Sequence, residues 1–222
     1  MKNHYIERYN NREIYFSDFL YYNRYFTNEI DRREVVKKNP LGSILEIGCS
    51  VGHYMKYFTD RKIGLDIDFP ALKQSGYKKV VCASIKNSLP FKDQTFSYID
   101  CQHVIEHIPN SYDFLIECKR VLKQGGQMIL STPNVKKIGF DFYIDYTHIK
   151  PFTSESLLHL AQDAGFKEYK ISYLHKSIPL IKHLYKLKAI KIETILWLQD
   201  ILYSLKFRHN QTLVLIAKKG KT

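Results

Sequence analysis

The chain has 222 residues, of which 45% are apolar and 25% charged, and this composition excludes an intrinsically disordered protein. Its longest run without a charged residue, residues 124–135, has twelve residues, whereas a membrane-spanning helix needs about 20 apolar residues. The net charge of +12 is concentrated late in the chain, because residues 167–222 hold 12 Lys and Arg against 3 Asp and Glu. Such a basic region favours phosphate-rich partners, namely nucleic acid, anionic lipid or a phosphorylated substrate; the alternative is a solvated face.

The amino terminus carries charge where a secretory signal would have its apolar core, at Lys2, Glu7 and Arg8. We therefore expect a cytoplasmic protein, and peripheral attachment to the inner face of the membrane stays open as an alternative. The four cysteines form no C-x-x-C pair, so neither a zinc ribbon nor a disulfide framework is indicated. These cysteines are Cys49, Cys82, Cys101 and Cys118.

Residues 4–38 are rich in Tyr and Arg and are expected to form helices over one edge of the core. From residue 43 onward, short β-branched runs alternate with helix-length segments, which predicts a parallel sheet with helices on both faces. The expected strands are Ser43–Ile47, Lys62–Ile67, Lys79–Ala83, Phe96–Gln102, Gln127–Ser131, Glu168–Leu174 and Thr212–Ala217.

Two helices are predicted between these strands. Asn110–Gln124 has apolar residues at helical spacing and ends at Gly125, and Glu155–Ala164 follows a cap at Thr153 or Ser154. We expect a single domain over the whole chain. Its parts are a helical cap (1–40), a cofactor-binding core (41–175), a basic helical insertion (176–208) and a last strand with its tail (209–222).

The insertion combines an apolar stripe between Leu184 and Leu205 with four lysines in its first half. These lysines are Lys182, Lys186, Lys188 and Lys191. Two readings follow from this pattern. The segment either packs on its own domain as a helical hairpin or lies on a membrane as a basic amphipathic element.

A glycine-rich turn, Glu46–Gly52, connects the first strand to the next helix-length segment. Such a turn brings the backbone close to a ligand at the carboxyl edge of the sheet. A dinucleotide fingerprint would place Gly where this chain has Ser50 and His53, and the Glu46 carboxylate would repel a phosphate. Asp66, at the end of the second strand, can accept two hydrogen bonds from a ribose diol. The pattern therefore favours an adenosine-type cofactor without a pyrophosphate.

Further motifs follow this loop in a fixed order: Gly64–Ile67, Ser88–Phe91, Phe96–His107 and Gly125–Gly126. With these motifs, over about residues 40–217, the chain resembles the class I S-adenosylmethionine-dependent methyltransferases, specifically the small-molecule group. The resemblance implies S-adenosylmethionine as cofactor. It also implies an α/β fold, a doubly wound seven-stranded mostly parallel sheet whose last strand is antiparallel.

The resemblance also implies which residues bind the cofactor. Those expected to border the methionine moiety are Glu46, Gly48 and Gly52, and Asp66 is expected to bind the ribose. Ser84 stands where the family usually has an Asp that contacts the adenine amino group, so the contact is weaker and is shared with the Ile85 amide. The expected set is completed by Cys49, Ser50, Ile67 and Gln102.

The first candidate for catalysis follows the fourth strand, where helical spacing would bring His103, Glu106 and His107 onto one face. The H-x-x-E-H pattern also occurs in zinc peptidases, a reading that the surrounding motifs exclude. Similar quinone-pathway O-methyltransferases hold a divalent metal with two acidic residues and a His here, so a metal-assisted variant stays open. We assign no metal ligand. The alternative to a catalytic role is a structural one, in which Glu106 and His107 hydrogen-bond the start of a helix.

The second candidate is the segment Asp145–Thr153, which resembles a loop of methyltransferases that act on sugars or lipid-linked saccharides. His148 is our first choice for the general base, because imidazole exchanges protons near neutral pH. Asp145 is expected to orient it. The alternative is that His148 braces the loop against the helix that Thr153 caps.

These features predict a methyltransferase that acts on a hydroxyl of a saccharide or lipid-linked small molecule. Strand four ends in Asp100–His103 and lacks the signature of amino-nitrogen methyltransferases, and Cys101 lacks the preceding Pro of pyrimidine C5 methyltransferases. An RNA methyltransferase and a non-catalytic protein that binds the cofactor or a membrane surface stay as alternatives. The expected partners are a small-molecule acceptor and an anionic membrane surface, with nucleic acid ranked behind them.

Overall fold

The computed structural model describes residues 43–52, 62–75, 77–86, 88–174 and 211–220. Residues 38–173 and 212–222 form one compact unit. The predicted helical cap (1–40) and the predicted insertion (176–208) lie outside the described residues. Among the helices that are described, none has the length and apolarity to cross a bilayer.

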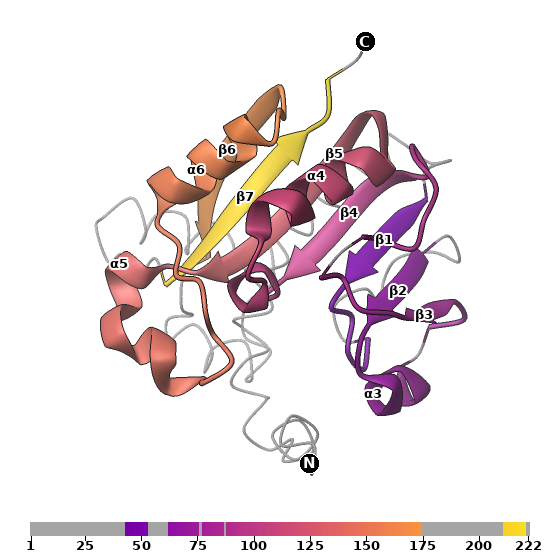
Figure 1. Cartoon of the computed structure of the whole chain (residues 1–222), viewed down its shortest axis with the longest axis horizontal. Helices are drawn as coiled ribbons and strands as arrows, with labels where there is room; N and C mark the ends of the chain where they lie inside the picture. Colours follow the sequence, from indigo (N-terminus) through magenta and orange to yellow (C-terminus); the bar gives the residue numbers. More distant parts are fainter. Residues whose placement is uncertain (1–42, 53–61, 76, 87, 175–210, 221–222) are drawn as a thin grey trace, which may run out of the picture. The chain divides into compact units, whose positions relative to one another are not determined.

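The centre of this unit is a seven-stranded sheet in the order β3-β2-β1-β4-β5-β7-β6 (Figure 1). Its strands are β1 (Ile44–Ile47), β2 (Lys62–Asp66), β3 (Val80–Cys82), β4 (Phe96–Gln102), β5 (Leu122–Pro133), β6 (Glu168–Leu174) and β7 (Thr212–Lys218). Strands β1 to β5 pair in parallel, and β7 runs antiparallel to β5. The predicted fold class is confirmed, including the antiparallel last strand.

The strand order reverses between β1 and β4, since β1 pairs with β2 on one side and with β4 on the other. In open α/β sheets, ligands bind at such a switch point, beyond the carboxyl ends of the strands. The residues that follow β1, β2, β3 and β4 therefore share one edge of the sheet with the expected ligand.

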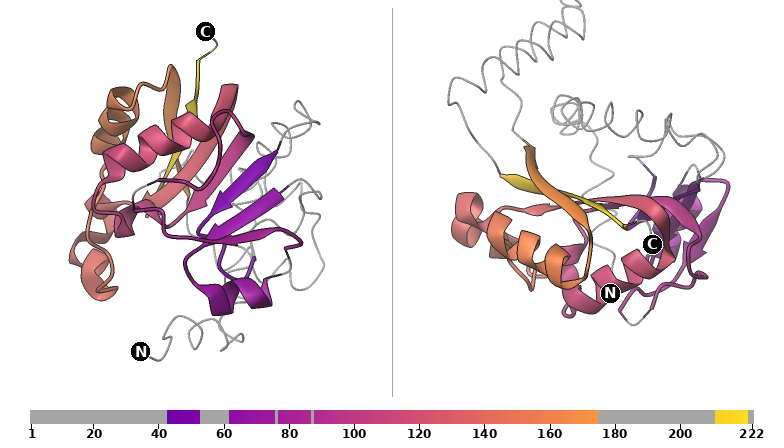
Figure 2. Two further views of the ribbon diagram at one scale, coloured as in Figure 1. Left: turned by 45° about the vertical axis from the view of Figure 1, so that its right-hand side comes forward. Right: turned by 90° about the horizontal axis from the view of Figure 1, so that it is seen from above.

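The core lies against both faces of the central strands, and all residues of β1 are buried. Strands that are covered on both faces read as continuous apolar runs, which is why they stand out in the sequence. Helices α4 (Ser111–Val121) and α6 (Ser154–Asp163) cover the same face (Figure 2). Their fully buried side chains include Leu115, Cys118, Leu157 and Ala161.

Helix caps account for the helix starts. Asn110 accepts a hydrogen bond from the backbone of Asp113 at the start of α4, and Thr153 forms a capping box with Ser156 at the start of α6. The shorter elements are α3 (Phe69–Gln74), η2 (Ile105–His107), α5 (Val135–Ile138) and η3 (Gly139–Ile144). The prediction of a helix to Gln124 was wrong at its end, because α4 stops at Val121 and Leu122 already pairs with Phe96 in the sheet.

The Arg120 guanidinium ties α4 to the preceding loop. It donates to the carbonyl oxygens of Leu89 at 3.0 Å and Phe91 at 2.8 Å, and it pairs with Glu117 and Asp93. The hydrogen bonds to Arg120, with burial as an opposing effect, lower the pKa of Glu117. This network fixes the loop that contains the motif Ser88–Phe91.

Arg120→Ala is expected to lower the free energy of unfolding by about 2 kcal/mol, because it removes charge-assisted hydrogen bonds to two carbonyls and two carboxylates. Chemical denaturation measures this change. Lys92→Ala, at an exposed lysine of the same loop, is the control and should change stability by less than about 0.5 kcal/mol. Equal effects of the two variants would contradict the role given to Arg120.

Candidate functional site

The predicted cofactor residues gather at one edge of the sheet. Glu46 lies in β1, Asp66 ends β2, Ser84 follows β3 and Gln102 ends β4. These strands are neighbours in the order β3-β2-β1-β4 and all run parallel, so their carboxyl ends meet at the switch point. The edge is long enough to place separate side chains along an extended ligand.

The loop after β1 has the backbone that its glycines predict. Gly48 has a φ of +72° and Gly52 a φ of +80°, and Ser50 between them also has a positive φ. A Cβ atom at Gly48 would lie 2.3 Å from Val104 Cγ2, so the close approach of the loop to the segment after β4 also requires glycine. The loop thereby presents backbone rather than side chains at this edge.

Asp66 is the residue that holds this loop in place. Its Oδ2 accepts a hydrogen bond from Ser50 N at 2.7 Å, and its Oδ1 accepts one from Asp68 N at 2.9 Å. Each carboxylate oxygen can accept a second hydrogen bond, so the same group retains acceptors for a ribose diol. Asp66 thus combines a structural role, which the sequence did not reveal, with the predicted binding role.

Glu46 is buried, and the Tyr77 hydroxyl donates a hydrogen bond to its Oε2. Tyr77 is a functional candidate that the sequence analysis missed, because it lies outside every motif. Burial, and after it the charges of Glu46 and Asp66, raise the pKa of the Cys49 thiol. This cysteine is therefore a neutral, unreactive side chain of the loop.

The remaining predicted cofactor residues differ in exposure. Ser84 is exposed and accepts a hydrogen bond from Lys86 N, whereas Ile85 beside it is half-buried. Ile67 is exposed at the end of β2. Gln102 is buried and donates to Asp100. Along the strand order β3-β2-β1-β4, the two exposed residues, Ser84 and Ile67, therefore lie after β3 and β2, and the two buried ones, Glu46 and Gln102, lie in β1 and β4.

The predicted helix through His103, Glu106 and His107 is absent, although the Glu106 carboxylate does lie near both imidazole rings. His103 has a φ of +53°, and only the single turn η2 follows it. Ile108 is extended because it precedes Pro109, so no helix continues through the segment. His103 Nδ1 lies 3.3 Å from Glu106 Oε1, whereas His107 contacts a different segment of the chain.

Glu106 is fully buried and lies at the centre of a second cluster, which also contains His107 and His148. Its Oε1 contacts His103, and its Oε2 accepts a hydrogen bond from Thr132 at 3.1 Å. Burial alone would raise the pKa of Glu106, but the hydrogen bond and charge of His103 outweigh it and lower the pKa below its usual value. Glu106 is therefore ionised at neutral pH.

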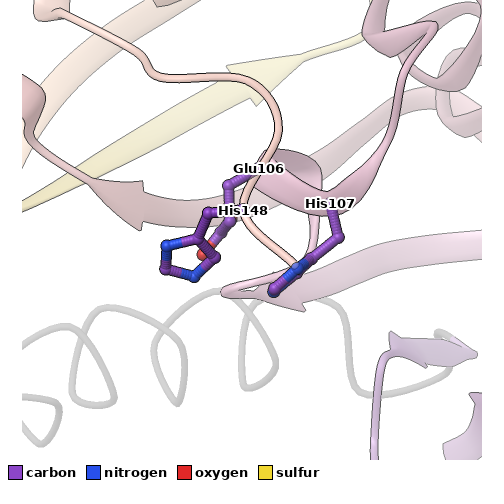
Figure 3. Close-up of side chains that lie close together, drawn as sticks. All are labelled: Glu106, His107 and His148. Atoms are coloured by element: carbon purple, nitrogen blue, oxygen red, sulfur yellow. The ribbon is translucent and has the colours of Figure 1, made fainter. Parts of the chain in front are cut away.

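His107 and His148 lie beside this carboxylate, and Figure 3 shows the three side chains together. One donor atom from each of the three lies within 4.8 Å of the others. His148 Nδ1 faces the Phe142 carbonyl at 2.7 Å, and His107 Nδ1 faces the Thr147 carbonyl at 3.1 Å. A carbonyl can only accept, so Nδ1 is the donor in both rings, and in the neutral tautomer of each ring the lone pair is on Nε2.

Asp145 acts mainly through Thr147. Its Oδ1 accepts hydrogen bonds from Thr147 N at 3.1 Å and from Thr147 Oγ1 at 2.7 Å, and that hydroxyl lies 3.0 Å from His107 Nδ1. Burial opposes the lowering, yet the Thr147 hydrogen bonds and the nearby histidines lower the pKa of Asp145. The His148 ring donates its Nδ1 hydrogen bond to the Phe142 carbonyl, and Asp145 acts on His148 through its own carbonyl, which accepts from His148 N at 3.0 Å, and through its charge.

Two imidazoles and one carboxylate are also a donor set for a divalent first-row metal ion. The hydrogen bonds behind His107, His148 and Glu106 resemble those that orient metal ligands in general. The cluster can thus serve either as a proton acceptor beside a buried negative charge or as a ligand set.

Comparison with known proteins gives an independent view. Residues 45–130 match the family model described as a methyltransferase domain. An uncharacterised protein of Methanocaldococcus jannaschii is 30% identical over 151 residues, which cover 62% of this chain and 71% of that protein. A probable S-adenosylmethionine-dependent methyltransferase of Mycolicibacterium smegmatis is 31% identical over 132 residues, which cover 56% of this chain. The match spans about half of that relative, 51% of its length.

The fold is similar to the crystal structure of an S-adenosylmethionine-dependent methyltransferase from Archaeoglobus fulgidus, with a TM-score of 0.64. The two chains are 23% identical, and the match covers 88% of this chain and 94% of the other. At this identity the likeness concerns the fold. The family model is described as a methyltransferase domain, so it indicates an activity as well as a fold. Its matched segment extends from β1 into β5 and includes the glycine loop and Asp66.

Proposed function

Because this chain belongs to the class I S-adenosylmethionine-dependent methyltransferases, we propose that it methylates a hydroxyl group of a saccharide or lipid-linked small molecule. Methylation of a hydroxyl requires an acceptor for the hydroxyl proton as well as a methyl donor. The observation that carries the proposal is the His148 ring, whose Nδ1 faces the Phe142 carbonyl at 2.7 Å. This hydrogen bond leaves Nε2 as a base of fixed orientation.

In this proposal the edge at β1 to β4 binds the cofactor. Glu46 and the loop from Gly48 to Gly52 border the methionine part, where a carboxylate suits its ammonium group. Asp66 binds the ribose, and Ser84 with the Ile85 amide meets the adenine. The bound cofactor supplies an electrophilic methyl group, and the residues of the chain position the acceptor and remove its proton.

The proton of the acceptor hydroxyl passes to Nε2 of His148 in this mechanism. The imidazolium that results lies beside the ionised Glu106, whose charge stabilises it. His107 and His103 flank the same carboxylate, and Asp145 keeps the His107 side of the site in place through Thr147. His148 is the catalytic residue, and the others are positioning residues.

The choice of oxygen as the methylated atom has some support among more distant relatives. The ubiquinone biosynthesis O-methyltransferase of Nitrosomonas europaea is 22% identical over 153 residues, and its name states O-methylation. The saccharide or lipid-linked acceptor is supported by the segment Asp145–Thr153 and its histidine. An RNA methyltransferase is the second candidate, and it is favoured only by the 12 Lys and Arg of residues 167–222.

The test is an acceptor screen with the purified full chain. S-adenosylhomocysteine formation is measured with pools of saccharides, lipid-linked saccharides, phenolic compounds and RNA. Turnover with a hydroxyl-bearing pool, followed by mass spectrometry that locates the methyl group on oxygen, supports the proposal. Turnover only with RNA, or methylation at nitrogen, contradicts it.

A chelator separates the two uses of the cluster formed by Glu106, His107 and His148. If His148 acts as a free base, we expect EDTA to leave turnover unchanged within about twofold, because no step needs a metal ion. If the cluster holds a metal ion, EDTA should abolish turnover and added Zn²⁺ or Mn²⁺ should restore it. In that case His107→Ala and His148→Ala should be similarly damaging, because each removes one ligand of the cluster, and the general-base role would be withdrawn.

A further inference from the structure

Half of the large apolar side chains that are exposed in the described residues lie in one short segment. Five of these ten residues fall between residues 140 and 149, and we call them the aromatic face: Phe140, Tyr143, Ile144, Tyr146 and Ile149. Phe140 is 92% exposed, Tyr146 86% and Ile144 72%. Single exposed apolar residues are ordinary, but five within ten residues of the chain indicate an interaction surface.

The aromatic face is held by a folded support. Phe142 lies in the middle of the segment and is fully buried, and its ring packs against His148 with centroids 4.7 Å apart. Asn134 caps α5 at the start of the segment, and Asp145 closes the turn through Thr147. The segment therefore buries one aromatic residue as an anchor and presents its neighbours outward.

Lysines flank the aromatic face on both sides. Lys136 and Lys137 are exposed on α5, and Lys150 follows the segment, against the acidic Asp141 and Asp145 within it. Lys136 pairs with Glu155 at 2.9 Å, an exposed contact of small energetic weight. Asp145 is engaged with Thr147. Apolar and aromatic side chains bordered by lysines are typical of surfaces that bind the interface of an anionic bilayer.

The segment also carries the catalytic candidate. Figure 1 shows α5 and the turns after it beyond the carboxyl end of β5, at the periphery of the unit. His148 lies between Tyr146 and Ile149 of the aromatic face in the sequence, and its ring is fixed by Phe142. Because the aromatic face and His148 belong to one short segment, a surface that binds the aromatic face also lies near the proposed base.

We propose that the aromatic face seats the protein on an anionic lipid bilayer, with the lysines of α5 at the headgroups. Attachment to the bilayer rests on this surface alone. The further step, delivery of a membrane-borne acceptor to His148, rests on the proposed function as well. The two can fail separately, because binding to vesicles needs no acceptor and methylation of a water-soluble acceptor needs no vesicle.

Charge favours lipid over the other occupants of such a face. One other occupant would be a segment of the same chain, but both long segments outside the described residues are net basic. Residues 1–42 hold eight Lys and Arg against six Asp and Glu, and residues 175–210 hold seven against two. A second copy of the chain would bring together two proteins of net charge +12. Like charges oppose both contacts, whereas an anionic headgroup layer attracts the lysines.

The experiment is co-sedimentation of the full chain with vesicles of phosphatidylcholine alone and of phosphatidylcholine mixed with phosphatidylglycerol. We expect binding to the mixed vesicles that weakens as salt is raised. The double variant F140S/I144S should lower the partition coefficient at least about tenfold, because two large apolar side chains are lost from the interface. Lys137→Glu should lower it about thirtyfold, because two units of charge change.

Matched variants control for unspecific effects. Tyr112→Ser removes an exposed apolar side chain on α4, and Lys92→Glu reverses an exposed charge outside the segment; both should leave binding within about twofold. Thermal unfolding and the affinity for S-adenosylhomocysteine must stay at the wild-type values in F140S/I144S. These two measurements exclude misfolding as the cause of lost binding.

Three results would overturn the proposal. The wild type could fail to bind mixed vesicles at low salt. F140S/I144S could bind as well as the wild type, which would assign binding to another part of the chain. The wild type could instead form a dimer in sedimentation velocity that F140S/I144S abolishes, which would assign the aromatic face to a second copy.

Discussion

His148→Ala is expected to lower kcat by about 10²–10⁴-fold while the dissociation constant of S-adenosylhomocysteine stays within twofold. The loss follows because the substitution removes the group that accepts the proton of the acceptor hydroxyl in the proposed mechanism. Cofactor affinity should be preserved, since the predicted cofactor residues lie on β1 to β4 and the loops that follow them, whereas His148 lies in the segment after β5. Steady-state kinetics and calorimetry on the same preparations measure both quantities.

Two further measurements separate a base from a residue that merely supports the loop. The residual activity of His148→Ala should rise with pH, because the acceptor then loses its proton to hydroxide. Thr147→Val, which removes the hydroxyl between Asp145 and His107, should reduce kcat less than His148→Ala does. His159→Ala, at an exposed histidine on α6, is the control and should retain full activity. Full activity of His148→Ala would leave positioning as the source of catalysis.

The centre of the sheet could be predicted because strands such as β1 and β4 are buried on both faces. Every residue of β4 except Ser97 is buried, and the predicted bounds of this strand agree with the structure. The cofactor edge followed from topology, since residues after parallel neighbouring strands must meet at one edge. Asp66 and the glycine loop could be paired in this way without knowledge of a single side-chain contact.

The contacts inside the site could not be predicted in the same way. The helical spacing of His103, Glu106 and His107 failed because one positive φ at His103 and one proline, Pro109, end the helical path. Tyr77 and Glu46 are 31 positions apart in the sequence, and no periodicity links them. Such pairs depend on the path of loops and on rotamers, which local sequence patterns do not specify.

The cluster of Glu106, His107 and His148 could not be predicted either, because His148 is even further in the sequence from the other two residues. Glu106 and His148 come from segments on either side of β5, and their proximity depends on the backbone of Glu106, whose carbonyl accepts from Ile149 N and Lys150 N. The burial of Phe142 then decides which way the segment faces. Sequence resemblance singled out both segments, but only the structure shows that the rings of His107 and His148 and the carboxylate of Glu106 lie together.

Asp66→Ala is expected to raise the dissociation constant of S-adenosylhomocysteine by about 100-fold, because two ribose hydroxyls lose a charged acceptor worth about 1.5 kcal/mol each. The loop contact to Ser50 N is lost as well, so the thermal midpoint of the ligand-free protein should also fall. Asp68→Ala is the matched control. Asp68 caps α3 by accepting from Ala71 N at 3.1 Å, so its loss should cost about 1 kcal/mol of stability and leave affinity within threefold. Unchanged affinity in Asp66→Ala, with the stability loss present, would confine Asp66 to bracing the loop and place the ribose elsewhere.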